Sequence, residues 1–115
     1  MMEVDNIVTS VRIATGLQKK MLSKLITQDY GMRGRSRWIE EAILAFLDIE
    51  GYEDLVKWDL SGEIRDITKP ISLTMAKSTM AKLDNAIVKV RKTFPELEGV
   101  KSGIIRAAII QRILR

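Results

Sequence analysis

The sequence predicts a mainly α-helical protein with two short β-strands. Within its 115 residues, a segment of alternating apolar and polar side chains followed by two apolar helical stretches occurs twice. Neither half, at about 45 residues, closes a hydrophobic core alone, whereas two halves packed together can. We therefore expect one compact unit over residues 1–115, an intramolecular pseudo-dimer whose halves, 6–48 and 69–115, are joined by an acidic linker at 49–68. Exchange of strands between two chains is the alternative.

Composition narrows the class of protein. Hydrophobic residues make up 46% of the chain and charged residues 30%, and the longest apolar run, residues 42–47, is far shorter than the roughly 20 residues of a membrane span. The N-terminus carries Glu3 and Asp5 where a secretory signal carries basic residues, so we expect a cytoplasmic protein. The chain has no Cys and no His, which excludes disulfides, thiolate or imidazole metal sites and His-based catalytic triads. We expect no metal, no cofactor and no membrane partner.

Charge is distributed unevenly along the chain. Residues 1–66 hold 9 basic and 12 acidic side chains, and residues 67–115 hold 10 basic and 3 acidic ones. Most of the acids lie between Glu40 and Asp66. If the protein binds a polyanion, we expect this acidic segment on the side that faces away from it. A solvated acidic surface without a partner is an equally compatible interpretation.

The first copy begins with a strand and continues with two helices. Over residues 7–13, every second side chain is expected to face the core and the others to face outward, which is the period of a strand buried on one face. A helical stripe starts at Leu17 and is expected to end near Asp29. Two glycines in residues 30–34 predict a turn, after which Ser36 is placed to cap a second helix. That helix carries Trp38, Ile39, Ala42, Ile43, Phe46 and Leu47 on its apolar side.

The second copy repeats this order. Ile71, Leu73 and Met75 alternate with polar residues, and a helix then runs to the turn before Pro95. Strand positions correspond at an offset of 62 residues and those of the last helices at 66, as from Ser36 to Ser102. The four additional residues predict either one extra helical turn or a longer loop near residues 93–99. Pro70 lacks an amide hydrogen and is expected to end the strand ladder.

The linker is too apolar for a disordered tether. Leu55, Val56, Trp58 and Leu60 are expected to pack on the body, with a short helix among them. For Trp58 we expect a role in covering or stapling the core rather than in recognition.

This layout resembles the ribbon-helix-helix DNA-binding family of the Arc and MetJ type, with two units in tandem. Besides the strands, the resemblance rests on a loose pattern in each second helix. The first copy has Gly34, Ser36, Ile39, Ala42 and Ile43, and the second has Ser102, Ile105, Ala108 and Ile109 with the glycine displaced to Gly99. The resemblance implies that the two strands pair into one two-stranded antiparallel β-ribbon, which enters the major groove of double-stranded DNA, about 12 Å wide.

The family also implies roles for particular residues. The side chains expected to face and read the bases are Val8, Ser10, Arg12, Ser72 and Thr74. Arg12 is the first candidate for specificity, because its guanidinium can donate two hydrogen bonds to a guanine. The alternative is that these residues only solvate an exposed sheet face.

In the same family, the N-termini of the second helices hold the DNA backbone. The residues expected to bind phosphate are Arg35, Ser36, Arg37, Lys69, Lys101 and Ser102. The alternative for Ser36 and Ser102 is that they are ordinary helix caps.

The biological role is less determined than the chemistry. The resemblance implies a transcriptional repressor or a plasmid or phage accessory protein of a relaxosome or partition system. Members of the family often bind side by side on DNA, so further copies of this chain are among the partners that the resemblance implies. The alternative is a protein-interaction module that uses the helical body and the acidic 40–66 region. We do not expect an enzyme, because the neighbouring Glu40 and Glu41 point in different helical directions and cannot act as a paired acid and base.

Overall fold

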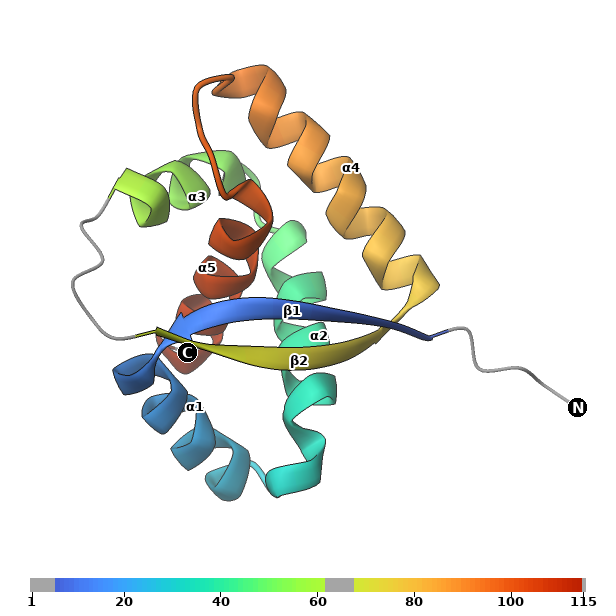
Figure 1. Ribbon diagram of the computed structural model, residues 1–115, viewed down its shortest axis with the longest axis vertical. Coiled ribbons are helices and arrows are strands. Elements are labelled where there is room, and N and C mark those ends of the chain that lie inside the picture. Colours follow the sequence, from blue (N-terminus) through green and yellow to red (C-terminus); the bar gives the residue numbers. More distant parts are fainter. Residues whose placement is uncertain (1–5, 62–67, 115) are drawn as a thin grey trace, which may run out of the picture.

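The computed structural model describes residues 6–61 and 68–114. The chain is mainly helical with one two-stranded antiparallel sheet, so the coarse fold class is confirmed. The elements are β1 (Asn6–Ala14), α1 (Thr15–Thr27), a short 3-10 helix (Met32–Gly34), α2 (Arg35–Leu47), α3 (Tyr52–Ser61), β2 (Thr68–Ala76), α4 (Lys77–Thr93) and α5 (Val100–Leu114). In Figure 1 the two strands cross in front of α2 and α5, with α1 and α4 on opposite sides of the ribbon. Among the described residues, no helix is both long and apolar enough to span a membrane.

The two strands pair along their whole length. Asn6 lies opposite Ala76, and Ala14 lies opposite Thr68. Ser10 and Ser72 form the central pair, and these two serines are also related by the sequence offset of 62. The ribbon is therefore symmetric in backbone register about its central serines, although its side chains differ from one end to the other.

One face of the ribbon closes the core. The inward side chains of Ile13 and Leu73 are completely buried, and those of Val11, Ile71 and Met75 nearly so. They pack on α2 and α5, the two helices behind the ribbon in Figure 1. The completely buried apolar residues of these helices are Trp38, Ile39, Ala42, Ile43, Phe46, Ile104, Ile105, Ala108 and Ile109. Because the core takes side chains from residues 11 to 109, residues far apart in sequence depend on one another for burial.

Pro70 does not end the ladder, contrary to the expectation. β2 begins two residues earlier, at Thr68, and Pro70 pairs with Arg12. The reason lies in the alternation of amide directions along a strand. The Thr74 amide points away from β1, because it donates to Ser36 Oγ at 3.1 Å. Pro70 is four residues before Thr74 and has the same orientation, so no ladder hydrogen bond is lost there.

The four additional residues of the second copy are found as an extra helical turn. α1 has 13 residues and α4 has 17, whereas the connections to the following helices are similar in length. α4 ends at Thr93, two residues before Pro95, as predicted.

The linker contains the expected short helix, α3. Val56 is completely buried and Leu55 and Leu60 are partly buried, so this segment packs on the body as predicted. Trp58 is 73% exposed, and a core-covering role for it is therefore wrong. The helical period explains the difference, since Val56 turns inward and a residue two positions later points about 200° away from it. Linker residues 62–67 lie outside the described residues.

Candidate nucleic-acid interface

The outward face of the ribbon carries all five residues predicted to read bases. Val8, Ser10, Arg12, Ser72 and Thr74 are exposed, and each occupies an outward position of the strand alternation. Across the ribbon, Val8 lies opposite Thr74 and Ser10 opposite Ser72. The structure therefore brings these residues together as one continuous row of mostly short side chains.

Arg12 is held at one end of this row by the neighbouring strand. Its Nε donates to Thr68 Oγ1 at 3.2 Å, and its Nη2 donates to the Thr68 carbonyl at 3.4 Å. Arg12 lies opposite Pro70, so its guanidinium crosses the ribbon diagonally to reach Thr68. This contact could not be predicted from the sequence, because the two residues are 56 positions apart.

The start of α2 abuts the free edge of β2. Arg35 Nη2 donates to the Ser72 carbonyl at 3.3 Å, and Ser36 Oγ accepts the Thr74 amide at 3.1 Å. The prediction that Ser36 caps α2 is wrong, because the helix begins at Arg35 and its N-cap is Gly34, without a side-chain cap. The Ser36 hydroxyl instead accepts a hydrogen bond from the Thr74 amide, which points to the free edge of β2.

The start of α5 abuts the other strand. Lys101, the second residue of α5, donates from Nζ to Thr9 Oγ1 of β1. Ser102 is partly buried in the same turn, and α5 begins two residues before it, so it does not occupy the cap position. Two helix N-termini thus lie against the ribbon, one at each strand.

The two remaining residues predicted to bind phosphate are exposed. The Arg37 guanidinium lies 4.7 Å from the centre of the Tyr30 ring. Lys69 lies on β2 beside Pro70, and its carbonyl accepts a hydrogen bond of 3.3 Å from Gln18 Nε2. The same Gln18 nitrogen donates to the Ile13 carbonyl at 3.0 Å, and it therefore ties α1 to both strands. Sequence reasoning missed Gln18, whose position on a polar helix face gives no indication of this role.

Glu40 lies at the end of the ribbon rather than on a distant acidic surface. Its Oε2 accepts the Ala76 amide at 2.9 Å and the Thr79 hydroxyl at 2.7 Å. Ala76 is the N-cap of α4, so the carboxylate sits at a helix N-terminus, where negative charge is favourable. If the protein binds a polyanion at the ribbon, Glu40 is therefore an exception to the expectation that the acidic segment lies on the side facing away from it. The Glu40 carboxylate therefore has a structural role at the start of α4, where it accepts two hydrogen bonds.

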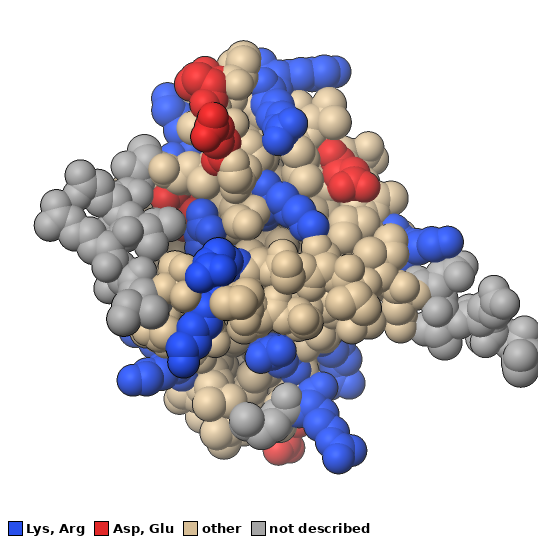
Figure 2. Space-filling view, in the orientation of Figure 1, with Lys and Arg blue, Asp and Glu red and all other residues tan. Residues whose placement is uncertain are grey.

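Basic side chains surround the ribbon on the side shown in Figure 2. Few acidic side chains are visible in this view, and a mainly uncharged band follows the ribbon between the basic groups. Away from the ribbon, acids form ion pairs between helices, as Asp59 does with Arg106 at 3.2 Å and Glu53 with Lys89 at 3.3 Å. A polyanion approaching the ribbon face therefore meets more positive than negative side chains.

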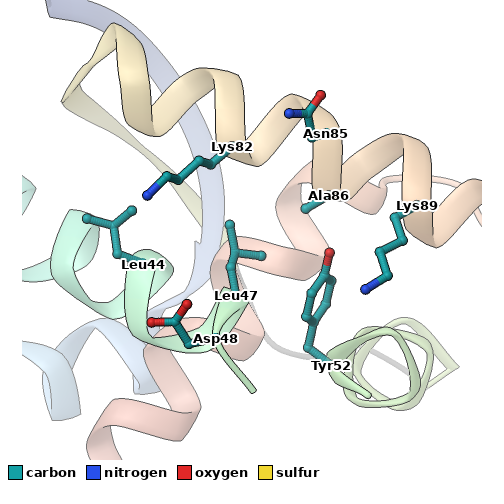
Figure 3. Close-up of a pocket in the computed structure, with 8 residues that line it drawn as sticks. All are labelled: Leu44, Leu47, Asp48, Tyr52, Lys82, Asn85, Ala86 and Lys89. Carbon is teal, nitrogen blue, oxygen red and sulfur yellow. The ribbon is translucent and has the colours of Figure 1, made fainter. Parts of the chain in front are cut away.

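A hollow between α2, α3 and α4 is a second concave feature (Figure 3). It is lined by Leu44, Leu47, Asp48, Tyr52, Lys82, Asn85, Ala86 and Lys89. Lys89 contacts two residues of α3: it forms an ion pair with Glu53, and its Nζ lies 5.0 Å from the centre of the Tyr52 ring. Burial raises the pKa of the Tyr52 hydroxyl above its ordinary value of 10.0, which keeps it neutral. These contacts join α3 to α4 and are explained by packing.

Comparisons with protein-family models, with curated proteins and with solved structures find no match to this chain.

Proposed function

We propose that this chain binds double-stranded DNA in a sequence-selective manner, as a tandem ribbon-helix-helix protein whose two halves form an intramolecular pseudo-dimer. The observation that carries the proposal is the ribbon itself, which exposes five aligned side chains on one face and has a helix N-terminus against each strand. The role that fits best is a repressor or a plasmid or phage accessory protein of the relaxosome or partition type.

The dimensions and the side chains of the ribbon suit the major groove. Paired strands lie about 4.8 Å apart, and a two-stranded ribbon fits a groove about 12 Å wide. Ser10, Ser72 and Thr74 are short, so the backbone can approach the base edges closely. Their hydroxyls donate and accept, and the Arg12 guanidinium donates two parallel hydrogen bonds to guanine O6 and N7.

The flanking helices supply contacts to the DNA backbone. α2 begins beside β2 and α5 begins beside β1, so one N-terminus is available for the phosphates on each side of the groove. Arg35, Arg37 and Lys101 add positive charge at these positions. Such contacts fix the register and orientation of a protein on the duplex without selecting a sequence.

The test is selection from a random DNA library at fixed salt, followed by measurement of affinity for the selected sequence. Arg12→Ala is expected to weaken that affinity about tenfold or more and to relax the preference at one base pair. The matched control is Lys57→Ala, which removes a positive charge from α3, an element that packs on α4 and α5. If the wild-type chain selects no DNA sequence from the library, the proposal fails, and binding of a protein partner becomes the better interpretation.

A further inference from the structure

We infer that the two ends of the ribbon read chemically different bases, with Val8 contacting a thymine methyl group at one end and Arg12, positioned by Thr68, reading a guanine at the other. The inference rests on the proposed DNA binding and adds the kind of site that is bound. It makes Val8 a specificity-determining residue and Thr68 a positioning residue.

The asymmetry follows from the register. Symmetry about the central Ser10–Ser72 pair relates Val8 to Pro70 and Arg12 to Thr74. One end of the reading face therefore presents Val8 opposite Thr74, and the other presents Arg12 opposite Pro70. The first end is neutral and partly apolar, whereas the second carries a cation. A palindromic site cannot satisfy both ends equally.

Val8 is an apolar side chain placed where the row is otherwise polar. It is 69% exposed, and the inward core gains nothing from it. The ribbon in Figure 2 is uncharged over its right-hand part, the end at which β1 begins in Figure 1. In the major groove, the thymine methyl is the apolar group that distinguishes base pairs. The branched Val8 side chain has few rotamers, so little conformational freedom is lost when it contacts that methyl group.

Arg12 is oriented before DNA arrives. Two of its five donors, on Nε and Nη2, are directed at the hydroxyl and the carbonyl of Thr68. The Nη1 hydrogens and the second Nη2 hydrogen remain directed away from Thr68, and these form the fork that donates to guanine O6 and N7. The Thr68 hydroxyl therefore positions the fork without contacting the base itself.

The geometry also sets the spacing of the two contacts. Val8 and Arg12 are four residues apart on one strand, which corresponds to about 13 Å at the rise of an antiparallel strand. Stacked base pairs are about 3.4 Å apart. We therefore expect the thymine and the guanine to lie within about four base pairs of each other.

Base analogues test this directly on the sequence selected by the wild-type chain. Each thymine is replaced in turn by uracil, which removes only the methyl group, and each guanine by 7-deazaguanine, which removes the N7 acceptor. One uracil position is expected to weaken wild-type binding about fourfold, the factor for burying one methyl group, and to have no effect on Val8→Ala. One 7-deazaguanine position within about four base pairs is expected to weaken binding by the wild type about tenfold and to have no effect on Arg12→Ala.

Thr68→Ala and Thr68→Ser test the positioning role. The alanine variant is expected to reduce the 7-deazaguanine effect, and the serine variant, which keeps the hydroxyl, to restore it. A general loss of stability would weaken binding to every analogue equally and would leave the ratio unchanged.

The outcomes separate this inference from the proposed function. If the wild type selects a DNA sequence but no uracil position depends on Val8, or the selected site is palindromic, the inference is wrong and the DNA-binding function stands. If no sequence is selected, the proposed function itself fails.

Discussion

Arg112 shows how a single side chain can join the two copies of the repeat. It lies near the end of α5, yet its Nη1 donates to the Trp38 carbonyl of α2 at 2.7 Å and its Nη2 to the Tyr30 hydroxyl at 2.8 Å. Its guanidinium also lies 4.6 Å from the centre of the Trp38 ring. The Glu41 carboxylate, 3.2 Å from Nη1, balances its charge. The planar fork of arginine suits this combination of partners.

Replacing Arg112 should therefore destabilise the fold. We expect Arg112→Ala to lower the free energy of unfolding by about 2–3 kcal/mol, from lost hydrogen bonds and lost stacking on Trp38. Arg112→Lys keeps the charge, but the lysine cannot reach the Trp38 carbonyl and the Tyr30 hydroxyl together. It should therefore recover only a small part of the stability lost in Arg112→Ala. Urea denaturation measures both variants, and equal stability of Arg112→Lys and wild type would contradict this account.

Two carboxyl groups should give opposite pH dependences of stability. Burial raises the pKa of Asp59 above its ordinary value of 3.8, against the attraction of Arg106. The hydrogen bond donated by the Tyr30 hydroxyl lowers the pKa of Glu41 below 4.5. The Asp59 contribution to stability is therefore fully present below 3.8 and is lost as the pH rises through its raised pKa. The Glu41 contribution is present above 4.5 and is lost as the pH falls through its lowered pKa.

Asp59→Asn and Glu41→Gln are the matched variants for this test. Between about pH 3 and pH 6, the free energy of unfolding of wild type minus that of Asp59→Asn should fall as the pH rises. The corresponding difference for Glu41→Gln should rise. Denaturation curves at several pH values measure both differences, and two slopes of the same sign would show that the assigned causes are wrong.

For individual residues, alternation in the sequence predicted which way the strand side chains point but not which groups they contact. Val11, Ile13, Leu73 and Met75 are inward as expected, because a period of two places them on one face whatever the rest of the chain does. The use of the Ser36 hydroxyl could not be predicted in this way. It depends on an edge amide of β2 that lies 38 positions away in sequence.

Among the elements, α3 lies between the two copies and belongs to neither. It packs on α5 and α4, and its Leu60 side chain occupies the space above Gly103 of α5. A Cβ atom on Gly103 would lie 2.9 Å from Leu60 Cγ, which is closer than carbon atoms approach without a shift. The position equivalent to Gly103 in α2 is Arg37, which is exposed. Gly103 therefore marks the place where α3 is seated.

This contact predicts the effect of substitutions in α5. Gly103→Ala should destabilise the protein by about 1–2 kcal/mol, because overpacking against Leu60 exceeds the gain in helix propensity. The control is Gly16→Ala in α1, where a Cβ would meet nothing within 4 Å and stability should be unchanged or slightly higher.

The double variant Leu60→Ala with Gly103→Ala completes a cycle measured by chemical denaturation. Its cost should be less than the sum of the two single costs, because the smaller side chain leaves room for the new methyl group. Additive costs would show that the two residues are not coupled.

Helices and strands were largely predictable because their apolar periods are local properties of the sequence. The short helix of the linker was expected, and the extra turn of α4 was one of two alternatives. The exposure of Trp58 was not predicted, because hydrophobicity alone does not fix which face of a short helix turns inward. The continuation of β2 through Pro70 depends on strand pairing, and pairing is not visible in a single segment.

For the whole molecule, the core requires both halves of the chain. Among the described residues, β1 has β2 as its pairing strand, and the side chains behind it come from α2 and α5 together. Residues 1–67 by themselves would leave Ile13 and Ile39 exposed to water, at a cost that so small a fragment cannot balance.

We therefore expect the fragment 1–67 to be unfolded and to regain helical structure when mixed with the fragment 68–115. Circular dichroism of each fragment and of the mixture measures this, with the intact chain as the reference. A cooperative thermal transition in either fragment alone would contradict the shared core.

The pairing of β1 with β2 also has a consequence for protein synthesis. The core can close only after β1, β2 and α5 have all been synthesised, so translation products that stop before α5 would lack the proposed DNA-reading surface. Such products could not compete with finished protein for its binding sites. Under the proposed function, occupancy of DNA would therefore report the amount of folded protein that contains β1, β2 and α5.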